Sequence, residues 1–558
     1  MSEPIEYLEL TLPRCGLTHG TAPCTASGTP KCYNTFTTCQ DRENFAEGEA
    51  VIHRFAMQQE GAAHGAMPAL RAVSDSSVKI DPDKGFGLSA SLTAVLTDFA
   101  LHDRAQDPYW RERTAQGTWL ARLIARNREN YFRRSCDVLR GHVGDAIEDM
   151  QRECYLLESI DGPDSNGRVQ IKAKDPILKF DDAMLPDPEA VYTVAADFDD
   201  QATSIVTTGR DPVLGELVLR IGSELIRGEF KNTPVFLVTE RGAFGSEADS
   251  HSAGDDLQVC YVAEDRPAID VLRDLRAAAD MDAFADDAQW ADEADQWLTL
   301  SLTHVVSKPT KVKKLLEAVL EQIRAYMWWE QRQQRIVLKA IAPLAYNDVP
   351  PAYNHVQHVL ADSFDLMDDL TKQITRVIVY FSPSDRTELG EAKNYRSISV
   401  TVDAEAELPE SYGREKTVEI FADWLESAGD ASSLGFRKLA RYRNGERRFK
   451  WAFDPKDGAI WTGEILDITH PAVVGGQGDY SGAPTAARVQ VIRAVSDGER
   501  IQYEGVTSEF TGRYAYFAPD SGVPDYDAAS DEEQLRYGFY SDDNGVVGAA
   551  DDAPYRYV

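Results

Sequence analysis

Four of the seven cysteines lie within 25 residues, at Cys15, Cys24, Cys32 and Cys39. Cysteine thiolates bind metals, act as nucleophiles and form disulfides, so this grouping is the strongest chemical signal in the chain. The residues between them are rich in Gly, Pro, Thr and Ser, which turn the backbone and bury little apolar surface. We therefore predict a loop without a core of its own, held together through the four thiols.

Three kinds of link would satisfy four thiols at these spacings. Zinc sites usually take two ligands from a tight knuckle with two to four intervening residues, whereas gaps of eight, seven and six residues separate these cysteines. Two disulfides suit small secreted domains, but the acidic N-terminal sequence has no signal-peptide pattern, so a reducing compartment is expected. An iron–sulfur cluster tolerates looser spacing. The residues predict a metal site and leave cluster, zinc and disulfides open.

A resemblance to a known family enters at the same residues. The block Pro23–Asp41, followed by Asn44 and Phe45, resembles the N-terminal signature of baseplate hub (tail-tip) proteins from long-tailed siphophages and related gene-transfer particles. Four cysteines hold a [4Fe–4S] cluster in that family. The resemblance therefore implies that the ligands here are Cys15, Cys24, Cys32 and Cys39.

Other candidate ligands give weaker signals. His19 lies between Thr and Gly and is more typical of a loop residue than of a substitute ligand. His355 and His358 have no carboxylate at the offset that a metal motif needs, and the acidic stretch 280–295 lacks EF-hand spacing, so it predicts a solvated helix face. The remaining cysteines stand singly, as buried core residues usually do: Cys136, Cys154 and Cys260.

The charge balance excludes some classes of partner. The chain has 58 basic and 92 acidic residues, a net charge of −34, which repels phosphate backbones and disfavours sequence-specific nucleic-acid binding. Solubility is the plainer reason for this charge, although a protein lining a DNA channel would also benefit from it. Apolar runs stay shorter than the roughly 18 residues that span a bilayer, so no membrane anchor is expected.

The hydrophobic pattern predicts a mainly β, multi-domain fold with α+β insertions. Apolar residues recur at helical spacing from Val312 to Ile323, which predicts an amphipathic helix with its apolar face in a core. A shorter helix is expected at 118–126. Strands and turn signals alternate over the last third of the chain. The expected units are a cysteine-rich segment 1–60, a first β-barrel 61–235, an α/β middle domain 236–375 with helix 309–324 and hairpin 326–341, a second β-barrel 376–518, and an acidic aromatic tail 519–558.

The function expected from the resemblance is structural. Nucleophile-elbow, P-loop and H-E-x-x-H motifs are absent from the sequence, so no enzyme is predicted. The family implies a homotrimeric hub of tube-like barrels in the virion, assembled in the host cytoplasm. Its partners would be the sixfold tail tube or distal tail protein above, a threefold central fibre or receptor-binding protein below, and a tape-measure protein in the lumen, with DNA passing through unbound. The alternative is an iron–sulfur enzyme of the lyase or oxidoreductase type, which four saturating thiols disfavour.

Overall fold

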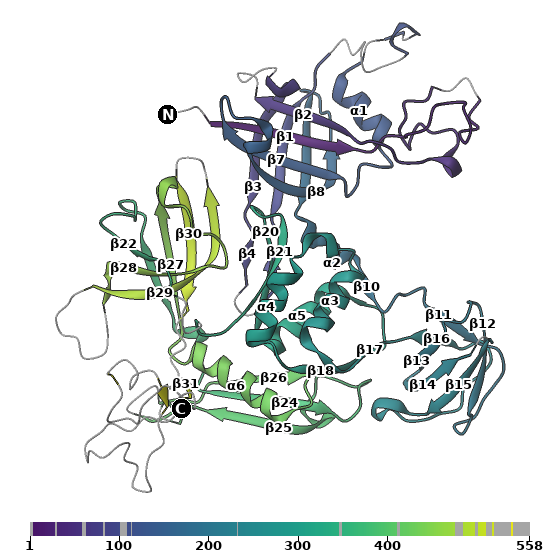
Figure 1. Ribbon diagram of the computed structural model, residues 1–558, viewed down its shortest axis with the longest axis vertical. Coiled ribbons are helices and arrows are strands. Elements are labelled where there is room, and N and C mark those ends of the chain that lie inside the picture. The colour runs from purple at the N-terminus through teal and green to yellow at the C-terminus, as the bar shows by residue number, and fades with distance from the viewer. Residues whose placement is uncertain are drawn as a thin grey trace.

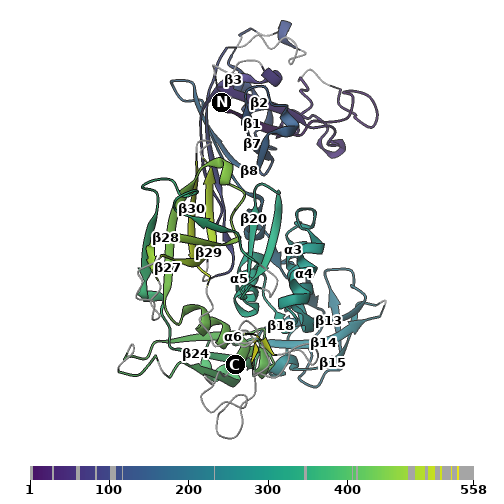
Figure 2. The same cartoon turned by 60° about the vertical axis from the view of Figure 1, so that its left-hand side comes forward.

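The computed structural model confirms a mainly β chain with helical insertions and two closed barrels. Figures 1 and 2 show the first barrel at one end of the long axis and the other units gathered towards the opposite end. No helix among the described residues combines the length and apolar character that a membrane crossing needs. The described residues are 4–508, with gaps at 28–30, 58–62, 82–83, 101–108, 113, 116, 232, 345–348, 405, 410–412, 475–483 and 497–499, together with 516–517, 530 and 537–538.

The first closed barrel has, in spatial order, the strands β1 (Pro4–Leu12), β2 (Val51–Met57), β3 (Met67–Ser76), β6 (Ser91–Thr97), β9 (Arg168–Lys174), β8 (Gln151–Asp161) and β7 (Ser135–His142). Buried and exposed residues alternate along β6 and β9, so one row of apolar side chains fills the interior. Leu92 faces Ala173 and Leu96 faces Val169 across this ladder. The predicted boundary at residue 60 falls between β2 and β3, inside the barrel.

The helix predicted at 118–126 lies beside this barrel as α1 (Trp119–Asn127). Its first residue, Trp119, is buried against Phe55, with ring centroids 5.8 Å apart, and stacks on Phe99. The helix therefore packs onto the barrel through one aromatic anchor.

The second closed barrel is smaller and consists, in spatial order, of β11 (Val191–Val194), β12 (Ser204–Thr208), β15 (Val235–Glu240), β14 (Glu224–Phe230), β13 (Gly215–Ile221) and β16 (Asp256–Val259). In its core, the centroid of the Phe230 ring lies 4.9 Å from that of Tyr192 and 5.0 Å from that of Phe236. At a bulge on β14, a Cβ on Gly228 would lie 2.2 Å from the Leu237 carbonyl oxygen, so only glycine fits there. The barrel spans the predicted boundary at residue 235.

Helices and short strands form the middle unit. The amphipathic helix predicted at 309–324 is α5 (Val312–Ile323), and the predicted hairpin 326–341 is β20 (Ala325–Glu330) with β21 (Arg335–Ala340). The other elements are α2 (Lys179–Asp182), α3 (Ala268–Ala278), α4 (Asp287–Trp297), the pair β17 (Tyr261–Pro267) and β18 (Ser301–Val306), and the pair β10 (Met184–Leu185) and β19 (Thr310–Lys311).

The last part of the chain contains two open sheets rather than one closed barrel over 376–518. A three-stranded sheet has the order β25 (Tyr395–Val402), β24 (Arg376–Pro383) and β26 (Thr417–Ala422), and α6 (Ala428–Tyr442) packs on it. A six-stranded sheet has the order β22 (Ala352–Asn354), β28 (Ile465–Val474), β29 (Pro484–Ser496), β30 (Ile501–Thr507), β27 (Glu446–Phe453) and β23 (Asp365–Asp369). The strands β31 (Tyr516–Phe517) and β32 (Tyr537–Gly538) pair with each other, and most of the predicted tail 519–558 lies outside the described residues.

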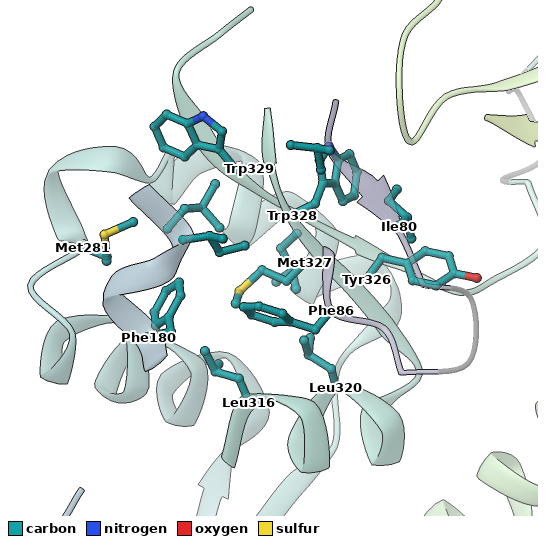
Figure 3. Close-up of a cluster of buried hydrophobic side chains, with 14 of the residues drawn as sticks. Ile80, Phe86, Phe180, Met281, Leu316, Leu320, Tyr326, Met327, Trp328 and Trp329 are labelled. Carbon is teal, nitrogen blue, oxygen red and sulfur yellow. The ribbon is translucent and has the colours of Figure 1, made fainter. Parts of the chain in front are cut away.

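A β-arm joins the first barrel to the middle unit. It consists of β4 (Lys79–Ile80) and β5 (Gly87–Leu88), between β3 and β6, and it lies along β20 (Figure 3). The Met327 N–H donates to the Gly85 carbonyl over 2.8 Å, and Phe86 enters the core beside Met327. A Cβ on Gly87 would lie 2.7 Å from the Trp328 Cβ, so glycine permits this close approach. One hydrophobic core therefore runs from the first barrel through the middle unit to the three-stranded sheet.

Short 3-10 helices occupy several connections. They are η1 (Arg42–Asn44), η2 (Ala63–Gly65), η3 (Trp110–Glu112), η4 (Ile147–Asp149), η5 (Pro176–Leu178), η6 (Ala243–Gly245), η7 (Asp282–Phe284), η8 (Leu370–Lys372), η9 (Ala392–Asn394) and η10 (Pro455–Asp457).

Candidate functional site

The four-cysteine loop, residues 13–50, is the connection between the adjacent strands β1 and β2. Its ends are pinned together, because the Cys15 N–H donates to the Asn34 carbonyl over 2.7 Å and Cys15 forms an isolated bridge with Glu47. Gly16 and Gly48 meet back to back, so that a Cβ on Gly48 would lie 2.6 Å from the Gly16 Cα. The loop therefore leaves the barrel through a neck, formed by Gly16 and Gly48, in which the two backbones are too close for a side chain between them.

Asp41 connects two parts of the loop that lie far apart in sequence. Its carboxylate accepts hydrogen bonds from the Thr25 N–H over 2.7 Å and from the Thr25 hydroxyl over 2.9 Å. The Asn44 amide donates to the same carboxylate over 3.0 Å. The Thr25 N–H, followed by Asn44, lowers the pKa of Asp41 and favours its charged form. This clamp holds the residue after Cys24 against the residues after Cys39.

The loop also rests on the C-terminal end of α1. The Thr35 hydroxyl donates to the Arg126 carbonyl over 2.6 Å, and the Arg126 guanidinium lies 3.8 Å from the centre of the Tyr33 ring. Between Arg14 and Ala50, Ala26 and Thr35 are the only buried residues among those described. The contacts are thus polar and aromatic at the edge of the loop, and the expected absence of an internal core is confirmed.

The four thiols are unbonded to one another and partly exposed. Burial raises the pKa of Cys32, the Asn34 N–H lowers it, and the charges of Cys39, Cys15 and Cys24 each raise it. The Cys32 thiol therefore lies within the electrostatic range of the other three.

The donor chemistry of this arrangement suits a metal cofactor. Thiolates are soft ligands that select zinc or iron–sulfur clusters. In the conformation described, no three His, Cys, Asp or Glu side chains of the described residues are arranged to hold a metal ion directly. A single tetrahedral ion would therefore require the thiols to move closer together.

A cavity of about 220 Å³ separates the loop from the barrel and α1. Cys32 lines it on the loop side, and Arg14, Arg122 and Arg126 bring positive charge to its walls. His53 contributes a ring whose pKa is lowered to about 4 by burial and by Arg14. Sequence reasoning missed these residues, although the spacing of Arg122 and Arg126 by four within a predicted helix places them on one face.

The weaker candidates have structural roles. The Nδ1 atom of His358 accepts a hydrogen bond from the Asn354 N–H over 3.1 Å, so this ring closes a turn, and His355 lies against His470. His19 is exposed on the loop. These contacts explain the two histidines 355 and 358 without a ligand.

The acidic stretch 280–295 is more structured than a solvated helix face. Asp286 caps α4 by accepting from the Ala288 and Gln289 N–H groups. Asp282 and Asp287 both pair with the buried Arg276, at 2.8 and 2.9 Å. The acids therefore fix the start of α4 and the packing of α3.

The three scattered cysteines also differ a little from the expectation. Cys136 and Cys260 are buried, whereas Cys154 is half-buried. Burial raises the pKa of Cys154 and of Cys260 to about 12 and raises that of Cys136 further. These thiols stay protonated at neutral pH and behave as small apolar residues.

Comparisons with known proteins find similarity to solved structures. No protein-family model matches the chain. No curated protein matches it either. The chain is similar to the tail protein from Neisseria meningitidis MC58 (10% identity, 90% of this chain and 98% of that one, TM-score 0.39). It is also similar to the 43 kDa tail protein of prophage MuSo2 from Shewanella oneidensis (8% identity, 78% and 95%, TM-score 0.37) and to a chain of a native gene transfer agent virion (12% identity, 68% and 82%, TM-score 0.33). Similarity at these TM-scores does not establish a function.

Proposed function

We propose that the chain is a structural protein of a phage-type tail, and specifically the baseplate hub at the distal end of a siphophage-like tail. It would be part of the virion after assembly in the host cytoplasm. It would connect the sixfold tail tube or distal tail protein to a threefold central fibre or receptor-binding protein. The tape-measure protein would occupy its lumen, and DNA would leave through it without specific contacts.

One observation carries this proposal: the residues that resemble the hub signature contact one another and hold the cysteine loop together. Asp41 clamps Thr25, and Asn44 supports Asp41. Phe45 packs edge-on against Phe36, with ring centroids 5.3 Å apart. The signature residues beyond the cysteines thus build the loop that presents the thiols. A chance similarity of composition would not give these residues a common structural task.

The arrangement of β units supports a hub that adapts one symmetry to another. The β-arm of the first barrel reaches the six-stranded sheet, where Lys79 meets Glu504 at 2.8 Å and the Arg493 guanidinium donates to the Ser77 hydroxyl over 2.9 Å. A homotrimer would contribute three copies of each unit. Six β units would face the sixfold tube while three subunits face the fibre.

The cofactor we propose is a [4Fe–4S] cluster held by Cys15, Cys24, Cys32 and Cys39, with zinc as the alternative. Either group would cross-link a loop that has no core, and its binding free energy would become folding free energy of the loop. The chain's own residues already do part of this work, because Asp41 and the Gly16–Gly48 neck bring the ends of the loop together.

Metal analysis of anaerobically purified protein tests the cofactor. We expect about four iron atoms and four labile sulfides per chain, with broad visible absorption. About one zinc per chain would instead favour a structural zinc clip. The Cys24→Ser variant should lose the metal, whereas Cys154→Ala, which removes a half-buried thiol outside the loop, should keep it.

Particle assembly tests the hub itself. If Cys24→Ser and Cys154→Ala are introduced into the producing phage or particle genome, only the first should block tails, visible by electron microscopy as heads without tails. Normal infectious particles carrying Cys24→Ser would contradict the role of the loop in assembly. Absence of the chain from purified tails would contradict the hub proposal as a whole.

The cavity beside Cys32 favours one alternative, an iron–sulfur enzyme of the lyase or oxidoreductase type. Its volume of about 220 Å³ and its three arginines suit a small carboxylate or phosphate substrate. If the chain were such an enzyme, the purified soluble protein would convert substrate to product. Turnover of a small anion that Arg122→Gln abolishes while iron content is kept would support the enzyme over the hub.

A further inference from the structure

A second, larger cavity lies far from the cysteines, between α5 and α6. Its volume is about 580 Å³, and residues of η8 and the first residues of β26 also line it. Five lysines from separate parts of the chain line it, accompanied by two glutamates on α5: Lys84, Lys314, Lys372, Lys416 and Lys438, with Glu317 and Glu321. This lysine pocket is positively charged in a chain whose net charge is −34.

Three of these lysines have no carboxylate partner. Within the described part of the chain, no Asp or Glu lies within ion-pair distance of Lys84, Lys314 or Lys416. The neighbouring Lys313 on α5, by contrast, pairs with Asp181 at 3.0 Å. The Lys416 ammonium donates to the Thr371 carbonyl. In so acidic a protein, ammonium groups without a carboxylate partner that converge on one hollow indicate that the acidic partner is supplied from elsewhere.

The floor of the lysine pocket is apolar. Ile374 is 4% exposed and Tyr442 is 2% exposed, and the Lys438 ammonium lies 5.0 Å from the centre of the Tyr442 ring. Ala318 and Val418 line the same floor. A basic rim over an apolar floor suits a peptide that combines acidic with aromatic or aliphatic residues. Nucleic-acid phosphates would use the rim alone.

The chain itself contains such a peptide. Residues 518–558 include ten acidic and two basic residues, and acidic blocks at 531–533 and 542–543 flank Leu535, Tyr537, Phe539 and Tyr540. The strand β31 directly precedes this region and pairs with β32 inside it, and β31 lies near α6 in Figure 1. We propose that the lysine pocket is the docking site for the acidic aromatic segment 518–558 of the same chain.

Zero-length cross-linking of the full-length protein tests this docking. A carbodiimide condenses a lysine amine with a carboxylate only where the two are in contact, so we expect amide links from Lys84, Lys314 or Lys416 to acids within 520–543. The double variant K314Q/K416Q should lower the yield of these links several-fold. K450Q, which removes an exposed lysine on β27, should leave the yield unchanged. In 1 M NaCl, where the Debye length is about 3 Å, the yield should also fall.

Isotope mixing separates docking within a chain from docking between chains. Protein grown in ¹⁴N and ¹⁵N medium is mixed before cross-linking, and each linked peptide pair is weighed. Pairs of a single isotope support the proposal. Mixed pairs would show that the segment of a second copy fills the pocket and would overturn it, as would links from the pocket lysines to other acids or no links at all.

Discussion

The two closed barrels differ in how they are joined to the rest of the molecule. The core of the first barrel continues through the β-arm into the middle unit and the three-stranded sheet. The second barrel closes around a separate core of its own, centred on Tyr192, Phe230 and Phe236. The first barrel also carries the long cysteine loop. The first barrel, which carries the loop, therefore shares the main core of the body, whereas the second barrel adjoins the middle unit through a smaller cluster in which Val218 and Leu225 pack with Val305.

The largest effect on the first barrel is expected when Phe86, which anchors the β-arm in the shared core, is removed. Phe86→Ala deletes a ring that is 3% exposed, and such deletions cost about 3–5 kcal/mol. Calorimetry should show the transition of the shared core at a lower temperature and an unchanged transition for the second barrel. Phe132→Ala, which removes a ring that is 55% exposed, is the matched control and should shift neither. Equal shifts of both transitions would mean that the barrels unfold together.

Acid should reduce the contribution of His304 to the stability of the shared core. His304 is buried against Trp424, and burial, followed by Arg386, lowers its pKa from 6.5 to about 3. The unfolded chain then binds a proton that the folded core refuses, so this contribution is full above pH 6.5 and falls by about 1.4 kcal/mol for each pH unit below it. Burial raises the pKa of Asp175 and of Glu330 to about 7, which acts in the opposite direction over the same range. Denaturant titrations of the wild type and of His304→Phe between pH 7 and pH 5 isolate the His304 contribution, and a difference between the two proteins that does not change with pH would contradict it.

A third test destabilises the second barrel alone. Glu224 is buried there, and its carboxylate accepts from Arg241 at 2.7 Å and lies 2.7 Å from the His251 Nε2. Glu224→Gln should cost about 1.5–3 kcal/mol, because hydrogen bonds to a charged group are lost. Only the transition of the second barrel should move.

The second barrel should lose stability in a lower pH range than the one in which His304 titrates. Despite the opposing effect of burial, the pairs with Arg241 and His251 hold the pKa of Glu224 below its ordinary 4.5. The charged form therefore stabilises the fold above pH 4.5, and this contribution is lost as the pH falls through the lower, folded value. The second barrel should stay stable between pH 6.5 and 5, where the contribution of His304 to the shared core is lost. Loss of both transitions over the same pH range would contradict this.

A smaller effect is expected at the neck of the cysteine loop. Gly48→Ala places a methyl group 2.6 Å from the Gly16 Cα and should cost about 1–3 kcal/mol through overpacking. Gly16→Ala, whose Cβ would lie 3.1 Å from the Gly48 Cα, should cost less. Both values come from denaturant unfolding of the first barrel. The reverse order would show that the neck is looser than described.

The smallest effect should remain local to the loop. Asp41→Ala removes the clamp on Thr25 and should speed tryptic cleavage after Lys31 several-fold without moving either thermal transition. Glu43→Ala is the matched control, because this exposed acid has no partner among the described residues. An equal rise in the cleavage rate of both variants would show that Asp41 does not hold the loop in place.

Local patterns predicted the local elements well. The spacing of apolar residues from Val312 to Ile323 depends only on neighbours three and four positions apart, and α5 lies there. The strand pattern of the last third likewise predicted β27 and β30. The second closed barrel escaped prediction because its strands are only four to seven residues long and several carry exposed residues, so their pairing depends on distant partners.

The site shows the same division. The spacing of the cysteines predicted one shared site, and this stays a prediction. The arginines of the cavity come from the end of β1 and from α1, about 110 residues apart in sequence, and no local pattern joins them. The identity of the cofactor stays a prediction, because thiol spacing specifies donors rather than metals.

The β-arm also has a mechanical consequence. Gly85 and Gly87 press backbone directly against the hairpin of Trp328, with no flexible side chain between them to absorb strain. A load applied to the first barrel is therefore transmitted as displacement of β20 and of the helices behind it, much as a strut passes force through a rigid joint. The second barrel adjoins β18 through the smaller cluster of Val218, Leu225 and Val305, so it would receive the load by way of the middle unit. A load on the β-arm would also reach the six-stranded sheet through Lys79 and Glu504.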